Sequence, residues 1–317
     1  MEARLWSLYL SLFATITALA LPFIQNPIFG IAVWLLILAS VAYSTEITIA
    51  IYEVRVWYNV MVVSALAALP QAVSAVNLAL NGHIEAAWID TLYSTIVDAI
   101  FVTGIVRRSI VGSDVMRSLV PSMVLWSIAA LFVDYYAHSG VQSSVISWGL
   151  VVLGYVLLPM LIVFNLGERA GGLPPASVLV NAALNTVAMV ISTWYLMEDI
   201  YALELSAAQL GIASAFITAL PDLLSAFMIR SIYAKFVSSE GGDAEAAATM
   251  LASAVHDQIS VPAVIILLAS GAGSLYPTWL NIYAILAKFS LLSRRAYLVT
   301  LATSLVILAL ALGFKPF

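Results

Sequence analysis

Long apolar segments joined by short connections make up almost the whole chain. A helix of about 20 apolar residues spans the ~30 Å hydrocarbon layer of a bilayer, and these segments lack the period-two alternation of a membrane β-barrel. With 63% hydrophobic and 9% charged residues, the chain holds more apolar side chains than a soluble core of its length could bury. We therefore predict an all-α integral membrane protein with about eleven transmembrane helices, at residues 5–24, 30–51, 57–81, 86–106, 118–138, 143–166, 174–198, 207–235, 245–270, 275–292 and 294–313.

The first segment, within residues 1–29, is predicted to be an extra N-terminal transmembrane helix. The alternative is a signal peptide, because Ala18, Leu19 and Ala20 resemble a cleavage site. The region before the segment carries both Glu2 and Arg4, and this weakly basic character favours the helix.

The positions of the basic residues predict the orientation of the chain. With the N-terminus in the cytoplasm, eleven of the twelve Lys and Arg residues fall at cytoplasmic ends or loops, and only Lys315 falls outside. The cytoplasmic set is Arg4, Arg55, Arg107, Arg108, Arg117, Arg169, Arg230, Lys235, Lys288, Arg294 and Arg295. We expect a multi-pass protein of the cell membrane with its N-terminus in the cytoplasm and its C-terminus outside.

Residues 30–166 and 174–313 each hold five of the remaining segments, and the two halves are similar. "AALPQAVSAV" (67–76) returns as "TALPDLLSAF" (218–227), and in the next segment "LYSTIVDAIFV" (92–102) aligns with "LASAVHDQISV" (251–261). Because each half has an odd number of spans, the second copy enters the membrane in the opposite orientation. We predict two inverted five-helix repeats, an arrangement in which transporters hold their substrate near the membrane midplane.

Three carboxylates, Asp98, Asp222 and Asp257, lie near the centre of predicted spans. An ionised Asp at this depth costs about 2.5 to 3.5 kcal/mol on insertion scales. We expect no salt bridge to them, because no Lys or Arg lies at their depth. Structural hydrogen bonding is one explanation for their presence, and a pathway for cations or protons is the one we favour.

Further oxygen atoms are predicted near these carboxylates. Proline within a helix removes a backbone donor, so Pro70 and Pro221 free the carbonyls of Leu66 and Ile217, and such carbonyls can coordinate a cation where they line a cavity. Two sets of residues at i, i+4 and i+8 each form one polar stripe on a helix: Asp90, Ser94 and Asp98, and Thr249, Ser253 and Asp257. Oxygen ligands of this kind suit hard cations such as Ca²⁺ and Na⁺, and the absence of cysteine excludes thiolate sites.

Three other features have a functional and a structural explanation. His256 could relay protons or pack between helices. Asn181, Asn185 and Thr186 could approach the site or pair with neighbouring helices. The loop "SSEGGDAEAAA" (238–248) could bind a regulatory cation or serve as a flexible linker. For each we expect the structural role.

At these residues the chain resembles the cation/calcium antiporter family, the sodium/calcium exchangers and their relatives. Each five-helix unit of that family carries a G-T-S-x-P-E segment followed in the next helix by G-S-N-x-x-N or G-S-N-x-x-D. The corresponding stretches here are "LAALPQ" (66–71) with "YSTIVD" (93–98), and "ITALPD" (217–222) with "ASAVHD" (252–257). The resemblance covers most of residues 30–313 in spacing and helix order, with a partial match in residues.

The resemblance implies a cation site with four central ligands and supporting hydroxyl groups, at Gln71, Asp98, Asp222 and Asp257, with Ser94, Thr218 and Ser253. The motif glycines and several hydroxyl residues are replaced. Gln71 stands where the family has Glu, and Asp98 stands where it often has Asn, so three carboxylates remain. The lost hydroxyls weaken the case for sodium as the counter-ion and leave protons as the alternative. The resemblance also implies that helices 30–51 and 174–198 slide against the rest.

The resulting prediction is a secondary active antiporter, and not an enzyme, that exchanges Ca²⁺ for Na⁺ or H⁺ by alternating access. The main alternative is a proton-coupled carrier of another cation or small solute on the same scaffold. An intramembrane aspartyl protease is a remote alternative, since its G-x-G-D motif is absent, and a purely structural membrane protein is another. The transported cation is a substrate, no cofactor is expected, and the expected partners are the lipid bilayer and inorganic cations, not nucleic acid. The sequence leaves the oligomeric state open.

Overall fold

The computed structural model describes residues 2–52, 59–106, 109–166, 175–220, 241–269 and 271–311. Throughout this part of the chain helices follow one another, and no strand occurs among these residues. In chain order the elements are α1 (Glu2–Ala20), η1 (Leu21–Phe23), α2 (Pro27–Tyr52), η2 (Asn59–Val63), α4 (Ser64–Leu80), α5 (Ile84–Ile96), η3 (Val97–Val106), α6 (Asp114–Ser118), α7 (Val120–His138), α8 (Ser144–Val152), η4 (Leu153–Leu157), α9 (Leu158–Asn165), α10 (Ala176–Tyr201), α11 (Ala207–Thr218), α13 (Gly241–Val255), η5 (His256–Ser260), α14 (Val261–Leu268), η6 (Ala272–Leu275), α15 (Thr278–Ser290) and α16 (Arg294–Ala311).

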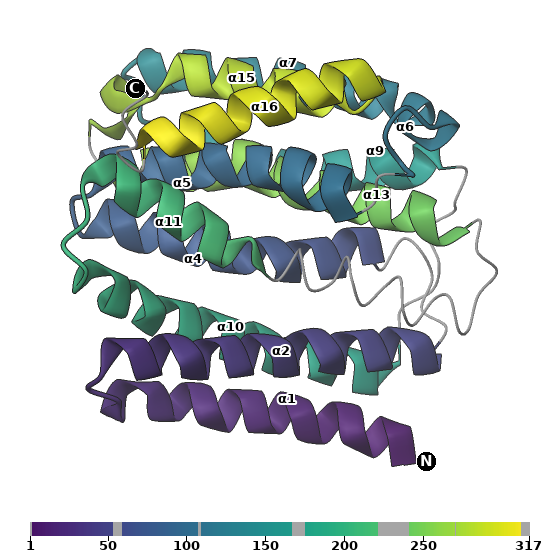
Figure 1. Ribbon diagram of the computed structural model, residues 1–317, viewed down its shortest axis with the longest axis vertical. Coiled ribbons are helices and arrows are strands. Elements are labelled where there is room, and N and C mark those ends of the chain that lie inside the picture. Colours follow the sequence, from purple (N-terminus) through teal and green to yellow (C-terminus); the bar gives the residue numbers. More distant parts are fainter. Residues whose placement is uncertain are drawn as a thin grey trace.

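The described helices follow the predicted apolar segments closely. Seven of the helices described are long and apolar enough to cross a membrane. The long helices run roughly parallel or antiparallel, with α1 at one end of the bundle and α7, α15 and α16 at the other (Figure 1). The protein is an all-α multi-pass membrane protein, as predicted. The count of eleven spans and the division into repeats 30–166 and 174–313 stay predictions.

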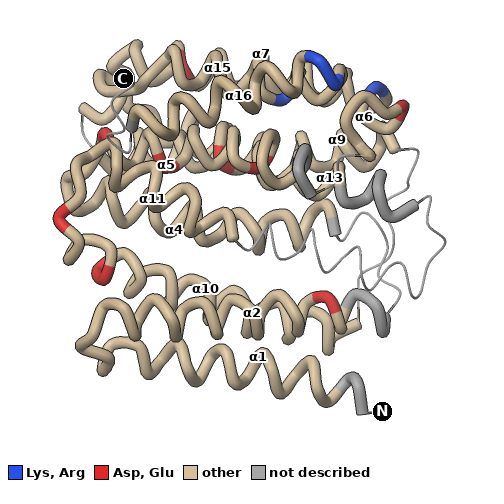
Figure 2. Tube along the Cα trace, viewed as in Figure 1, with Lys and Arg blue, Asp and Glu red and all other residues tan. Residues whose placement is uncertain are grey.

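Apolar side chains face outward, as expected for helices surrounded by lipid. Phe23, Ile28 and Val145 are 84%, 78% and 80% exposed. Since lipid tails are as apolar as leucine, exposure of these groups carries no penalty in a bilayer. The described Lys and Arg residues instead lie near α6, α15 and α16, on the right-hand side of the view, the side at which α1 also begins, while several acidic residues lie in the middle of the bundle near α5 (Figure 2).

Helices α1, α2 and α10 form a sub-bundle held together by buried hydrogen bonds. The Asn181 side chain on α10 donates to Ser11 Oγ on α1 and to Ser44 Oγ on α2, both at 2.7 Å. Asn185, one turn later, donates to Thr45 Oγ1 at 2.9 Å. The expectation that these asparagines pair with neighbouring helices is therefore confirmed. Through α10 this sub-bundle packs against α4 and α11, beyond which lie α5 and then α15, α16 and α7 (Figure 1).

The helix that carries Pro70 is not broken at the proline. The described backbone is helical through Pro70 from Ser64 to Leu80, so the proline removes a single backbone donor without ending the helix. A π-helical turn, η2, lies directly before α4. Irregularities of this type are common near functional sites in helices.

The linker predicted at 238–248 is wrong in its second half. Helix α13 begins at Gly241 and continues through the alanine-rich stretch to Val255. Alanine has the highest helix propensity of all residues, which outweighs the two glycines at the start. Residues 238–240 lie outside the described part of the chain.

One glycine allows α11 to approach α5 very closely. A Cβ atom added at Gly211 would lie 2.7 Å from the backbone oxygen of Ala86 and 2.7 Å from Cβ of Ile89. Small residues at such crossings let membrane helices pack backbone to backbone. The close contact fixes which residues of α11 face α5.

We predict that Gly211→Ala lowers the stability of the protein, although alanine is the better helix former. The clash with α5 should cost about 1–3 kcal/mol, more than the ~1 kcal/mol that alanine gains within a helix. Thermal unfolding in detergent measures the difference. The matched control is Gly149→Ala in α8, where nothing lies within 4 Å of the added Cβ. Equal stability of the two variants would contradict the prediction.

Candidate functional site

The predicted central residues that the structure describes are all buried. Gln71, Asp98 and Asp257 have no exposed surface, and neither do Ser94 and Ser253. Asp222, with Pro221, lies outside the described residues. Among the residues that are described, no three acidic or histidine side chains gather at metal-binding distances. The structure therefore tests the arrangement around Asp98 and Asp257, not the complete four-position set.

Helix α5 contacts the π-helical turn η5 at Asp257. The hydroxyl of Ser94 donates to Oδ2 of Asp257 at 2.9 Å. Thr91, one turn earlier, donates its hydroxyl to the backbone oxygen of Asp257 at 3.2 Å. Two hydroxyl groups of the predicted first unit thus meet the buried carboxylate of the predicted second unit. Sequence reasoning did not select Thr91.

The two acidic residues occupy the same place in two π-helical segments. Segment η3 begins at Val97 and η5 at His256, so that Asp98 and Asp257 are each the second residue. A π-helical turn shifts the residues that follow it and leaves backbone groups outside the regular α-helical pattern. The helix α13, which carries Ser253, packs against η3. The polar stripe of α5 therefore packs against η5 of the predicted second half, and the polar stripe of α13 packs against η3 of the predicted first half. Both contacts lie where an α-helix passes into a π-helical segment.

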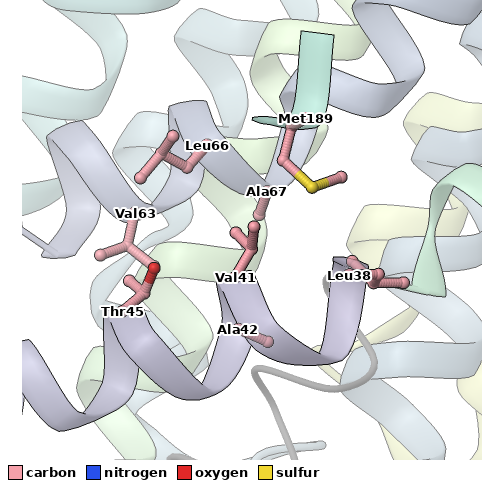
Figure 3. Close-up of a pocket in the computed structure, with 8 residues that line it drawn as sticks. All are labelled: Leu38, Val41, Ala42, Thr45, Val63, Leu66, Ala67 and Met189. Carbon is pink, nitrogen blue, oxygen red and sulfur yellow. The ribbon is translucent and has the colours of Figure 1, made fainter. Parts of the chain in front are cut away.

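Leu66, whose carbonyl was predicted to be a cation ligand, lies at the edge of the sub-bundle. Its side chain lines a small cavity with Val63 and Ala67 of the adjoining turns (Figure 3). The other walls come from α2, with Val41 and Thr45 among them, and from α10. The volume is about 20 Å³, room for one water molecule. The cavity lies between α4 and the helices α2 and α10.

Two residues of α11, Thr218 and Ile217, were also predicted to supply oxygen atoms to a cation, and the structure supports this role less well. Thr218 is buried and donates its hydroxyl to the Ser214 carbonyl of its own helix at 2.7 Å. Ile217 is half-buried and packs against the apolar core. The predicted release of the Ile217 carbonyl depends on Pro221, which lies outside the described part of the chain.

No family model and no curated protein matches this sequence. Solved structures of the sodium–calcium exchanger NCX_Mj do match the described fold. The exchanger soaked with 2.5 mM Na⁺ and 10 mM Sr²⁺ superposes with a TM-score of 0.60 at 17% identity, over 90% of this chain and 99% of the exchanger. With 1 mM Sr²⁺ the TM-score is 0.59 at 15% identity, over 95% and 98% of the two chains. The chain has the fold of a sodium–calcium exchanger.

The exchanger fold here contains a buried polar network beside Asp257 that the sequence did not reveal. Lys288 of α15 is completely buried, and its ammonium group donates to Oε1 of Gln258, the residue after Asp257. The amide nitrogen of Gln258 donates in turn to Oδ1 of Asn281 at 2.6 Å. The ammonium nitrogen lies 2.8 Å from the ring centroid of Trp126.

This network changes the expectation about basic residues in the interior. Lys288 was placed among the cytoplasmic ends, yet it is as buried as the carboxylates. In the described part of the chain it forms no salt bridge, and a neutral amide and an aromatic ring hold it instead. The spacing of Asn281 and Lys288, seven residues apart and so on one helix face, was the signal that could have identified the pair.

His256 has the structural role that we expected. Its ring stacks on Tyr155 of η4 with 4.3 Å between ring centroids, and Nε2 lies 3.1 Å from the hydroxyl of Ser64 on α4. The side chain therefore joins η5 to η4 and α4. Gly154 of η4 lets η4 pack closely against η5, because a Cβ atom at this position would lie 2.1 Å from Oγ of Ser260.

We predict that Gln258→Leu destabilises the protein and that adding Lys288→Met restores part of the loss. The single variant leaves a buried ammonium without its amide acceptor, and a hydrogen bond to a charged group contributes about 1.5–3 kcal/mol. Replacing both partners by apolar side chains removes the stranded charge. Thermal unfolding of the wild type, both single variants and the double variant gives the coupling energy. Gln142→Leu, at an exposed glutamine, is the control. A double variant no more stable than Gln258→Leu would contradict the prediction.

Proposed function

We propose that this exchanger-fold protein is a secondary active cation antiporter that exchanges Ca²⁺ for Na⁺ or H⁺ by alternating access. The observation that supports it most is the contact of Ser94 with Asp257, a hydroxyl and a carboxylate from opposite halves of the sequence, both without exposed surface. A structural hydrogen bond alone would not require a carboxylate at this depth, where ionisation is costly.

The charges suggest how the exchange would work. Asp98 and Asp257 together, when ionised, balance one divalent ion or two monovalent ions. A carrier that can change sides only when its buried charges are compensated couples the movement of one ion to that of the other. Asp222, the remaining predicted carboxylate, would add one more charge.

The sub-bundle of α1, α2 and α10 is our candidate for the moving part. Its contact with α4 contains the small cavity lined by Leu66 and is mostly apolar, so sliding there breaks few hydrogen bonds. One polar contact near its end joins Tyr201 of α10 to Asn77 of α4 at 2.6 Å. Because Asn181 fastens α1 to both other helices, we propose that all three move together.

We also propose that the N-terminus is cytoplasmic and the C-terminus is outside. The described Lys and Arg residues lie on the side of the bundle at which α1 begins, and this supports the orientation (Figure 2), since basic residues favour the cytoplasmic side. The proposed partners are the lipid bilayer and the transported inorganic cations, and no cofactor is proposed.

We predict that Asp257→Asn abolishes calcium transport. Purified protein in proteoliposomes should take up radioactive calcium when a Na⁺ gradient or a pH gradient is imposed. Loss of one charged ligand at 1.5–3 kcal/mol weakens cation binding by about tenfold or more. The control is Glu85→Gln, at an exposed acidic residue on the predicted outer end of α5.

Two results would reject the proposal. One is the absence of calcium flux in the wild type under both gradients, and the other is full flux in Asp257→Asn. If the wild type carries a different ion in competition measurements, the alternative of a proton-coupled carrier on the same scaffold replaces the calcium antiporter.

A further inference from the structure

A further buried carboxylate, Asp90, shares the polar stripe of Ser94 and Asp98 but is not one of the predicted central ligands. It is on α5, two turns before Asp98, and has no exposed surface. The hydroxyl of Ser74 on α4 donates to its Oδ2. Its other oxygen, Oδ1, has no hydrogen-bond partner among the described residues. A buried carboxylate oxygen in this state requires a ligand or a proton.

The surroundings of Asp90 are built from three helices. Gly211 brings α11 against Ala86 and Ile89 of α5, and this approach places Ser214, one turn further along α11, beside the Asp90 carboxyl group. Ser74 also donates to the backbone oxygen of Gln71 at 3.0 Å. The Asp90 carboxyl is thus connected through Ser74 to the helix segment that carries a predicted central ligand.

Within the described part of the chain, no salt bridge to Asp90 is formed. The described parts of α4 and α11 contain no titratable residue. Among the other elements packed against α5, η5 carries His256 and Asp257, η3 carries Asp98, and α15 carries Lys288 and Tyr283. Lys288 is held by Gln258 and Trp126, and His256 by Ser64 and Tyr155. The remaining titratable neighbour is Tyr201 of α10.

We propose that Asp90 is a separate proton-binding site, located on the predicted outer side of the central site, and that it carries the counter-ion of the exchange. The transport role rests on the proposed antiporter function, whereas proton binding itself does not. In the binding step an O–H bond forms at Oδ1 with a proton from the outer solution, and the same bond breaks when the proton is released on the other side of the cycle.

The chemistry of the surroundings favours a proton over a metal ion. A calcium ion takes six to eight oxygen ligands, whereas the neighbours identified around Asp90 are two serine hydroxyls. A single carboxylate also balances only one positive charge. Burial makes the ionised form unfavourable, and the neutral acid removes this penalty without needing space for an ion.

Infrared difference spectroscopy between acidic and alkaline buffer tests protonation directly on the full-length protein. The wild type should show a carboxylic-acid band that Asp90→Asn lacks and that the control Glu85→Gln retains. Because the readout involves no transported ion, it decides on proton binding even if the protein does not carry calcium. A spectrum of Asp90→Asn identical to that of the wild type would overturn the proposal.

Transport in proteoliposomes tests the coupling role. Asp90→Asn should still bind calcium, with an affinity that no longer changes with pH, but lose calcium flux driven by a pH gradient by tenfold or more, whereas Asp257→Asn loses calcium binding itself. Retained calcium binding also shows that Asp90→Asn is folded. Flux driven by a pH gradient at the wild-type rate in Asp90→Asn would overturn the coupling role, and the proposed antiporter function would stand.

The milder variant Ser74→Ala provides an independent readout. The Ser74 hydroxyl donates to the carboxyl group and so stabilises its ionised form. Without this bond Asp90 should hold its proton more tightly, and the pH at which pH-driven flux is half-maximal should rise by roughly half to one unit. An unchanged or lower midpoint would contradict the assignment.

Discussion

A membrane protein must satisfy its interior polar groups by itself, because the surrounding lipid offers no hydrogen bonds. The contact between α5 and η5 shows how this chain meets that requirement. Two hydroxyls of α5 reach Asp257, one at its side chain and one at its backbone. The rest of the bundle holds these two elements in register, with Gly211 and Gly154 allowing backbones to approach where larger residues would force them apart.

The polar groups of the interior divide into two kinds. One kind fastens helices together: Asn181 with its serines, and His256 between Tyr155 and Ser64. The other kind is ionisable and is costly to bury, as with Asp90, Asp257 and Lys288. Hydrogen bonds among neutral groups could stabilise the bundle without these charges. The charges therefore require an explanation in terms of what the protein binds.

The sequence predicted the helices and their order well, because long apolar runs and short connections leave few other choices. It also selected Ser94, Asp98 and Asp257 from their spacing and from the repeat; the structure places all three in the interior, and their role as ligands stays a prediction. It did not predict the π-helical turns, which arise from packing between segments distant in sequence, or the unbroken helix through Pro70. Lys288 was misjudged because a position near a helix end suggests access to water. In the structure, Trp126 and Gln258 enclose it, and neither lies near it in sequence.

The separation of Asp90 from Asp257 gives the proposed exchange a physical logic. If cation and proton used only the same oxygens, every proton bound would weaken the cation site directly. A proton on Asp90 instead changes the charge directly before Thr91 and one turn before Ser94, the residues that contact Asp257. Charge at such a distance in a poorly screened interior still alters cation affinity. Two separate acidic positions on one helix can therefore couple two ions without sharing a ligand, and the coupling would weaken if water entered between α4 and α5.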